Sequence, residues 1–385
     1  MLENLDKIPW DTLEHAYGEA KDVPGLIRKL ASKNTKERED ALWHLYGNIW
    51  HQGTVYEATS CAVPFLIELL ENPVPDKDKI LVYLSNLASG HSYLDVHQHM
   101  SFYDERRDKE EFKKQLLKEH EWVIKSHEAV LKGCPVYRKL LHDEEPSVRA
   151  ASAYLLGIFP EKADENLPVL KSHIKNEVNE MVLAACVFSA GLLSGKKEED
   201  WLKEILNSPS PFSVCIAAAL GLGRIMPEHM PEEGLKLLIE GTVNPGNAKD
   251  IFKEFPWDDA DVQTYCCEAL AVTGKKSEKV LGALIKVMDE VTPYESWTVV
   301  NAILHLVFNG KPVGNTMTAE ELSKEQKEAL TAIAKSKKFW KDFDKGTLVC
   351  NVMEIMKSFN LPQMPETLQA FLDGKISQTD KEWNN

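Results

Sequence analysis

The stretch Leu140-Leu-His-Asp-Glu-Glu-Pro-Ser-Val-Arg-Ala-Ala-Ser-Ala-Tyr-Leu-Leu-Gly157 decides the fold class of this chain. From Val148 to Leu155, apolar and small residues recur at the i, i+3, i+4, i+7 spacing of one helix face. Pro146 is a residue that commonly opens a helix. A short amphipathic run at 136–141 comes before it, and the polar segment 142–145 separates the two. The stretch therefore predicts one helix, a turn and a second helix.

The pattern of the second helix returns further along the chain, at intervals of 34 and 32 residues, which is a period typical of helical repeat arrays. Each copy carries Ala and Gly at its fourth and tenth positions, where small residues let neighbouring helices approach closely. The three copies are Val148, Ala151 and Gly157; Val182, Ala185 and Gly191; and Val214, Ala217 and Gly223.

Other pairs of apolar runs extend the array towards both ends, which gives about eight pairs. The sequence therefore predicts an all-α fold, an α-solenoid of helical hairpins. We expect a single domain over 1–376, with one long insertion at about 89–133, and a polar C-terminal tail over 377–385. The further pairs are 23–30 with 38–45, 63–70 with 80–87, 235–239 with 262–272, 280–288 with 297–308, and 321–334 with 347–359.

The phrase at 140–151 resembles the HEAT-repeat family, in which a short first helix, an Asp-containing turn and a Val-Arg pair open the second helix. Asp143 and Arg149 match the ladder positions of that family. The phrase His51-Gln-Gly-Thr-Val-Tyr-Glu-Ala-Thr59 is similar to an element of bacterial HEAT-repeat proteins of unassigned function. The resemblance implies an armadillo-like α-solenoid that serves as a scaffold or a protein-binding surface.

The composition narrows the classes of partner. The formal net charge of -15 disfavours nucleic acid, because non-specific binding to phosphates depends on Lys and Arg. An acidic surface instead suits a basic protein partner. The sequence has no apolar run long enough to span a bilayer and no signal peptide, so we expect a cytoplasmic protein without membrane contact.

Aromatic and polar residues gather around the turn after the second predicted helix, and we take them as the binding residues of this region. Trp and Tyr are frequent anchors in protein interfaces. The competing interpretation is structural: aromatic residues at helical spacing are more often core, and Gly53 with Thr54 or Thr59 suits a turn and a helix cap. The residues are Trp43, His44, Trp50, His51, Gln52 and Tyr56.

Two departures from the repeat supply the remaining binding candidates. His97 and His99 lie in the histidine-rich start of the insertion, where the imidazole groups bind a metal, contact a partner or are polar loop residues that bind nothing. Their spacing matches no established metal motif, so we predict neither a metal nor a cofactor. Trp257 lies in the long connection before residue 262, and such connections are often functional.

The sequence favours a non-enzymatic protein-binding scaffold that presents a concave helical surface. In its sharpest form, the protein is an inhibitor or immunity-type partner that occludes a basic protein. The alternative is a HEAT-like enzyme, similar either to the DNA glycosylases that act on nucleic acid or to the bilin lyases. The net charge disfavours the first of these, and the sequence identifies no tetrapyrrole partner for the second.

Overall fold

In a computed structural model of the chain, the described residues are 1–98, 103, 106–257, 261–273, 278–314, 317–340 and 350–377. Apart from two short β-hairpins, the regular secondary structure of these residues is helical, which confirms the predicted all-α class. The chain divides into two compact units. The first comprises Met1–Leu193 and Phe255–Trp257, and the second begins at Ser194. A single domain over 1–376 stays a prediction, and the predicted tail lies outside the described residues from 378 onward.

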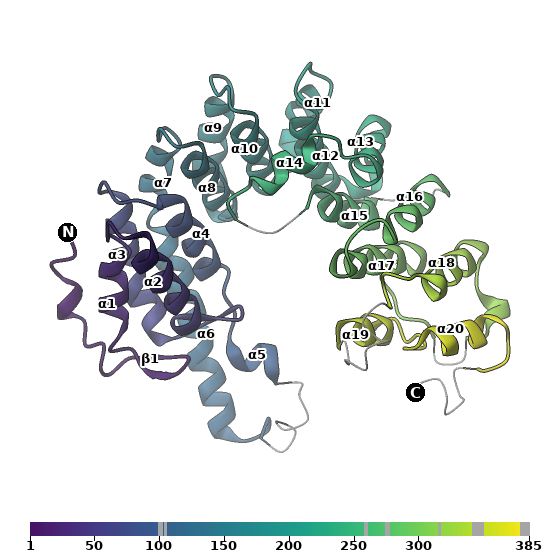
Figure 1. The fold of residues 1–385 in the computed structure, drawn as a ribbon, viewed down its shortest axis with the longest axis horizontal. Coiled ribbons are helices and arrows are strands. Elements are labelled where there is room, and N and C mark those ends of the chain that lie inside the picture. Colours follow the sequence, from purple (N-terminus) through teal and green to yellow (C-terminus); the bar gives the residue numbers. More distant parts are fainter. Residues whose placement is uncertain are drawn as a thin grey trace. The chain divides into compact units, whose positions relative to one another are not determined.

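The first unit stacks helical hairpins in chain order (Figure 1). Two antiparallel hairpins accompany them: β1 (Glu14–His15) with β2 (Gly18–Glu19), and β3 (Trp50–His51) with β4 (Thr54–Val55). Its 3-10 helices are η1 (Leu5–Lys7) and η3 (Pro160–Lys162). Its α-helices are α1 (Val23–Lys29), α2 (Thr35–Asn48), α3 (Glu57–Leu70), α4 (Lys77–Ala88), α5 (Tyr93–His97), α6 (Glu110–Leu131), α7 (Cys134–Leu140), α8 (Pro146–Gly157), α9 (Ala163–Ile174) and α10 (Glu180–Leu193).

The close approach of α8 and α10 explains the Gly at the tenth position of the repeat. A Cβ atom added to Gly157 would lie 2.8 Å from Cβ of Ser189 and 2.9 Å from its carbonyl oxygen. Non-bonded carbon atoms prefer separations of about 3.5–4.0 Å, so a larger residue would push the two helices apart. The predicted role of the small residue is therefore confirmed at Gly157.

The predicted insertion forms α5 and α6 and takes part in the core. The helix α6 packs against both α3 and α4, and it buries Phe112, Trp122 and Val130. Because α4 also packs directly against α8, the array continues past the inserted segment. The insertion is therefore a structural layer of the first unit, as well as a departure from the repeat.

The second unit continues with hairpins of the same kind. The connection before Val262, predicted as a long loop, contains a six-residue helix over Ala248–Lys253, which buries Phe252. Its 3-10 helices are η4 (Lys196–Glu198), η5 (Pro227–His229) and η6 (Ala319–Glu321). Its α-helices are α11 (Glu199–Leu206), α12 (Phe212–Ile225), α13 (Glu232–Val243), α14 (Ala248–Lys253), α15 (Val262–Thr273), α16 (Glu278–Met288), α17 (Pro293–Phe308), α18 (Lys324–Lys335), α19 (Cys350–Ser358) and α20 (Pro365–Leu372). No helix among the described residues is both long enough and apolar enough to cross a bilayer.

Candidate functional site

Several of the predicted binding residues lie in the hairpin that joins α2 to α3. In this hairpin Trp50 pairs with Val55, and His51 pairs with Thr54. The two-residue connection has positive φ at both positions, 49° at Gln52 and 90° at Gly53. Such turns match the twist of a two-stranded ribbon, and Gly tolerates the left-handed backbone without strain. The predicted turn at Gly53 is confirmed.

We use the name aromatic cluster for five aromatic side chains of this region, which include two packed pairs and the separate Trp43: Tyr17, Trp43, Tyr46, Trp50 and His51. The ring of Tyr46 lies edge-on to Trp50 at 5.4 Å between centroids, and Tyr17 lies edge-on to His51 at the same distance. Trp43, at the centre of α2, is 77% exposed, and Tyr17 is 70% exposed. Large aromatic side chains that stay in solvent are uncommon in a folded chain, so these two are the candidates for contact with a partner.

The remaining members of the predicted set near this turn divide by exposure. His44 and Gln52 are exposed, whereas Trp50, His51 and Tyr56 are half-buried. The hydroxyl of Tyr56 lies 2.8 Å from that of Thr54, and its backbone N–H donates to the Thr59 hydroxyl at the start of α3. Burial raises the pKa of Tyr56 above its usual range. Tyr56 and Thr59 therefore hold the hairpin against α3, in line with the structural interpretation.

The other candidates lie apart from the aromatic cluster in sequence. His97 stacks on Tyr93 at 4.2 Å and bonds through Nδ1 to the Tyr93 carbonyl, and His99 lies outside the described residues. Trp257 is 7% exposed and lies parallel to Tyr154 at 4.4 Å, with Phe255 stacked on it at the same distance. Within the described part of the chain, no three His, Cys, Asp or Glu residues are placed to hold a metal ion.

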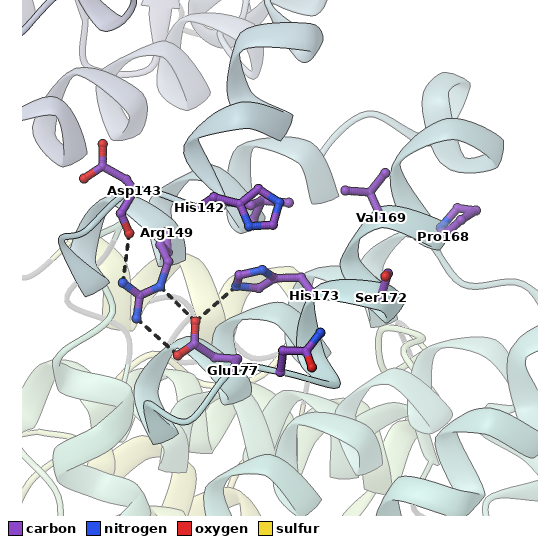
Figure 2. Close-up of a pocket in the computed structure, with 10 residues that line it drawn as sticks. His142, Asp143, Arg149, Pro168, Val169, Ser172, His173 and Glu177 are labelled. Atoms are coloured by element: carbon purple, nitrogen blue, oxygen red, sulfur yellow. Dashed lines mark hydrogen bonds and ion pairs between the residues drawn. The ribbon is translucent and has the colours of Figure 1, made fainter.

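A polar pocket that the sequence did not indicate as a site lies between the α7–α8 turn and α9. Figure 2 shows its lining, and we call it the histidine pocket. It is open and has a volume of about 620 Å³. The rings of His142 and His173 lie edge to face at 5.4 Å, and Nε2 of His173 is 3.1 Å from Oε2 of Glu177. The His-x-x-x-Glu spacing at 173–177, which joins His173 in the last turn of α9 to Glu177 in the segment that follows the helix, is the sequence signal that could have indicated it.

Glu177 is the centre of this pocket's polar network. Its side chain is only 4% exposed, and the Arg149 guanidinium binds both carboxylate oxygens, at 2.8 and 3.1 Å. Burial raises the pKa of Glu177, but the bonds from Arg149 and from two backbone N–H groups outweigh it and lower the pKa to about 2. Burial lowers the pKa of His173, and the Glu177 carboxylate opposes this only in part. At neutral pH the pair is therefore a carboxylate and a neutral imidazole.

The same geometry recurs at the turns of the first unit, where a cation of one hairpin binds an acid in the turn of the next. Nε of Arg38 donates to Asp76 at 2.7 Å, and Lys77 lies 3.6 Å from the Asp143 carboxylate. Arg149 then reaches Glu177. The resemblance matched Asp143 and Arg149 to one ladder, but the structure joins Arg149 to the backbone carbonyl of Asp143. The carboxylate of Asp143 faces the preceding turn instead.

Comparison with known proteins gives little beyond the fold. No family model matches the chain, and no curated protein matches it. Among solved structures, the complex of CpcE and CpcF of phycocyanin lyase from Nostoc sp. PCC7120 is similar, with a TM-score of 0.45 and 15% identity over 80% of this chain and 92% of the other. An engineered protein has a TM-score of 0.32 and 15% identity, over 92% and 99% of the two chains. Similarities of this size carry no functional argument.

Proposed function

We propose that this chain is a HEAT-like repeat protein without catalytic activity, and that it binds another protein through the aromatic cluster of its first unit. The observation that supports this most directly is the exposure of Trp43 on α2. An indole in solvent contributes little to folding, but it buries a large apolar area when a partner covers it. Trp and Tyr are accordingly enriched among the few residues that dominate interface energies.

The surroundings of Trp43 also suit an interface. Tyr46 and Trp50 follow Trp43 closely in sequence, and their rings pack against each other. Tyr46 is also held in place by a hydrogen bond that its hydroxyl accepts from Asn86 on α4. Side chains that are fixed before binding lose less conformational entropy when the partner arrives. The alternatives of a glycosylase-like and a bilin-lyase-like enzyme gain no support from the described residues.

The test is affinity capture from the native cell with the wild-type chain, followed by measurement of Kd for the captured partner with the variant Trp43→Ala. We expect affinity to fall by at least tenfold, since hot-spot residues contribute roughly 2 kcal/mol or more. The thermal midpoint should stay within about one degree, because an exposed side chain contributes little to stability. Val272→Ala, a truncation of a 66% exposed side chain on α15, serves as the control. Unchanged affinity in Trp43→Ala would remove the aromatic cluster as the binding surface.

A further inference from the structure

A groove runs along the turns of the first unit, between the α3–α4 turn and the α7–α8 turn. We call it the turn groove, and its volume is about 630 Å³. Its lining consists of residues 73–78 together with Asp143, Glu145, Ser147 and Val148. Pro73, Val74, Pro75 and Val148 give it apolar walls. Walls of this kind can cover the methylene stem of a long side chain whose charged end lies elsewhere.

The ion pairs of the first unit leave the turn groove with unmatched negative charge. Arg38 is paired with Asp76, and Lys77, the only cation of the lining, faces Asp143. Among the residues that the structure describes, the carboxylates of Asp78 and Glu145 have neither an ion-pair nor a hydrogen-bond partner. Two carboxylates in an open groove that are not paired with a cation favour a positively charged ligand.

The histidine pocket adds an unused hydrogen-bond acceptor, and it adjoins the turn groove because both are lined by Asp143. The His173 side chain is only 9% exposed, and its Nε2 is bound to Glu177. The two nitrogens of an imidazole point apart, so Nδ1 is directed away from Glu177, and no described residue bonds to it. Since the ionised Glu177 accepts the Nε2 proton, Nδ1 of the neutral ring is an acceptor.

We propose that the turn groove and the histidine pocket together bind an extended basic segment of a partner protein, with a Lys or Arg side chain in each. Ammonium and guanidinium groups are donors without acceptors, which matches Asp78 and Glu145 in the groove and Nδ1 of His173 in the pocket. Anionic ligands would meet the same carboxylates and are repelled. The proposal extends the protein-binding function to a second surface, and it does not depend on the aromatic cluster.

A structural role for the same acids has to be separated from this proposal. Asp78 lies in the first turn of α4, and Glu145 is the N-cap of α8. Carboxylates at these positions stabilise a helix through its macrodipole without any ligand. The control must therefore remove equally placed acids elsewhere. Glu232 in the first turn of α13 and Glu366 in the first turn of α20 are comparably placed, and both are exposed. Glu232 also pairs with Lys236 at 3.4 Å, but an ion pair this exposed contributes little to stability.

The experiment measures fluorescence anisotropy of a labelled octapeptide of alternating arginine and alanine with the full chain at low salt. We expect the double variant Asp78→Asn/Glu145→Gln to weaken binding at least tenfold, and Glu232→Gln/Glu366→Gln to change it less than twofold. A peptide of alternating glutamate and alanine should not bind. If the groove double variant does not fold, the two single substitutions replace it, and each should weaken binding at least threefold.

Equal weakening by the two double variants would overturn the proposal, because it would show attraction to the net charge alone. Absence of arginine-peptide binding at millimolar concentration would overturn it as well. Trp43→Ala should bind the arginine peptide as the wild type does. If the arginine peptide does not bind but a protein partner binds in a way that depends on Trp43, only the groove proposal is refuted. If the arginine peptide binds as expected but Trp43→Ala leaves the affinity for the protein partner unchanged, only the aromatic cluster is refuted.

Discussion

At the scale of single residues, Glu177 shows what the sequence could and could not predict. The resemblance located Arg149 in a ladder, and Arg149 does take part in one. Its acidic partner could not be read from the sequence, because Glu177 lies 28 residues further on, in the next turn. Arg38 likewise binds Asp76 in the next turn. Each of the two guanidinium groups also donates to a carbonyl six residues upstream, that of Arg38 to Ser32 and that of Arg149 to Asp143.

Glu177 gives a prediction for acid stability. Its pKa is lowered from 4.5 to about 2 in the folded chain, so its contribution is fully present above pH 4.5 and is lost as the pH falls towards 2. This lowering of the Glu177 pKa corresponds to at most roughly 3 kcal/mol of the free energy of unfolding. We therefore expect the stability gap between wild type and Glu177→Gln, measured by urea unfolding at pH 6, 4.5 and 3, to narrow steadily with acidification. His173, whose pKa is also lowered, adds a loss of stability below about pH 6.5 in the wild type.

The control for this effect is Glu165→Gln. Glu165 pairs with Lys162 and Arg138 at the surface, and its side chain is 47% exposed, so solvent screens the interaction. Its substitution should leave the acid dependence close to that of the wild type. If the difference in the free energy of unfolding between wild type and Glu177→Gln stays constant from pH 6 to pH 3, the prediction that the buried Glu177 carboxylate stabilises the fold through its ion pair is wrong.

At the scale of elements, the sequence predicted a helix well where the spacing of its apolar residues and its boundary residues indicate the same range. The second helix of the opening stretch is observed over Pro146–Gly157, the bounds that its Pro and Gly indicate. The helix α14 was missed between Pro245 and Pro256, because a six-residue helix is marginal alone and depends on burying Phe252. The strands of the β3–β4 hairpin are two residues long, too short for an alternating pattern to indicate them.

The contact between α8 and α10 predicts the outcome of a single added methyl group. Gly157→Ala should lower the free energy of unfolding by about 1–3 kcal/mol, because the new Cβ would clash with Ser189. Gly282→Ala on α16 should instead raise it by about 0.5–1 kcal/mol, since that exposed site has no atom within 4 Å and Ala has the higher helix propensity. Urea unfolding of both variants measures the two signs. Stabilisation by Gly157→Ala would show that the helices are further apart than described.

At the scale of the whole molecule, helices in each unit contact mainly their neighbours along the chain, as expected of a repeat array. The segment Phe255–Trp257 is an exception, because it belongs to the first unit although it follows α14. It packs its rings on Tyr154 of α8 and Phe188 of α10. The position of Trp257 in a long connection marked it as a candidate binding residue in the sequence. Its packing partners could not be predicted, because they lie about 70–100 residues earlier in the chain and such contacts leave no local sequence pattern.

This exception predicts how far a local change spreads. Trp257→Ala should lower the local free energy of unfolding around α8 and α10 by about 3–5 kcal/mol. Amide hydrogen exchange in α8 and α10 should therefore rise, while α1 and α2 stay protected, because repeat arrays transmit stability mainly between neighbours. Trp257→Phe should change exchange much less, because the ring is kept and Nε1 of Trp257 has no hydrogen-bond partner among the described residues. Exchange measured by mass spectrometry separates these outcomes. A uniform rise from α1 to α10 would mean that the first unit opens as one cooperative block, and no rise at all would mean that the Trp257 stack does not hold α8 and α10.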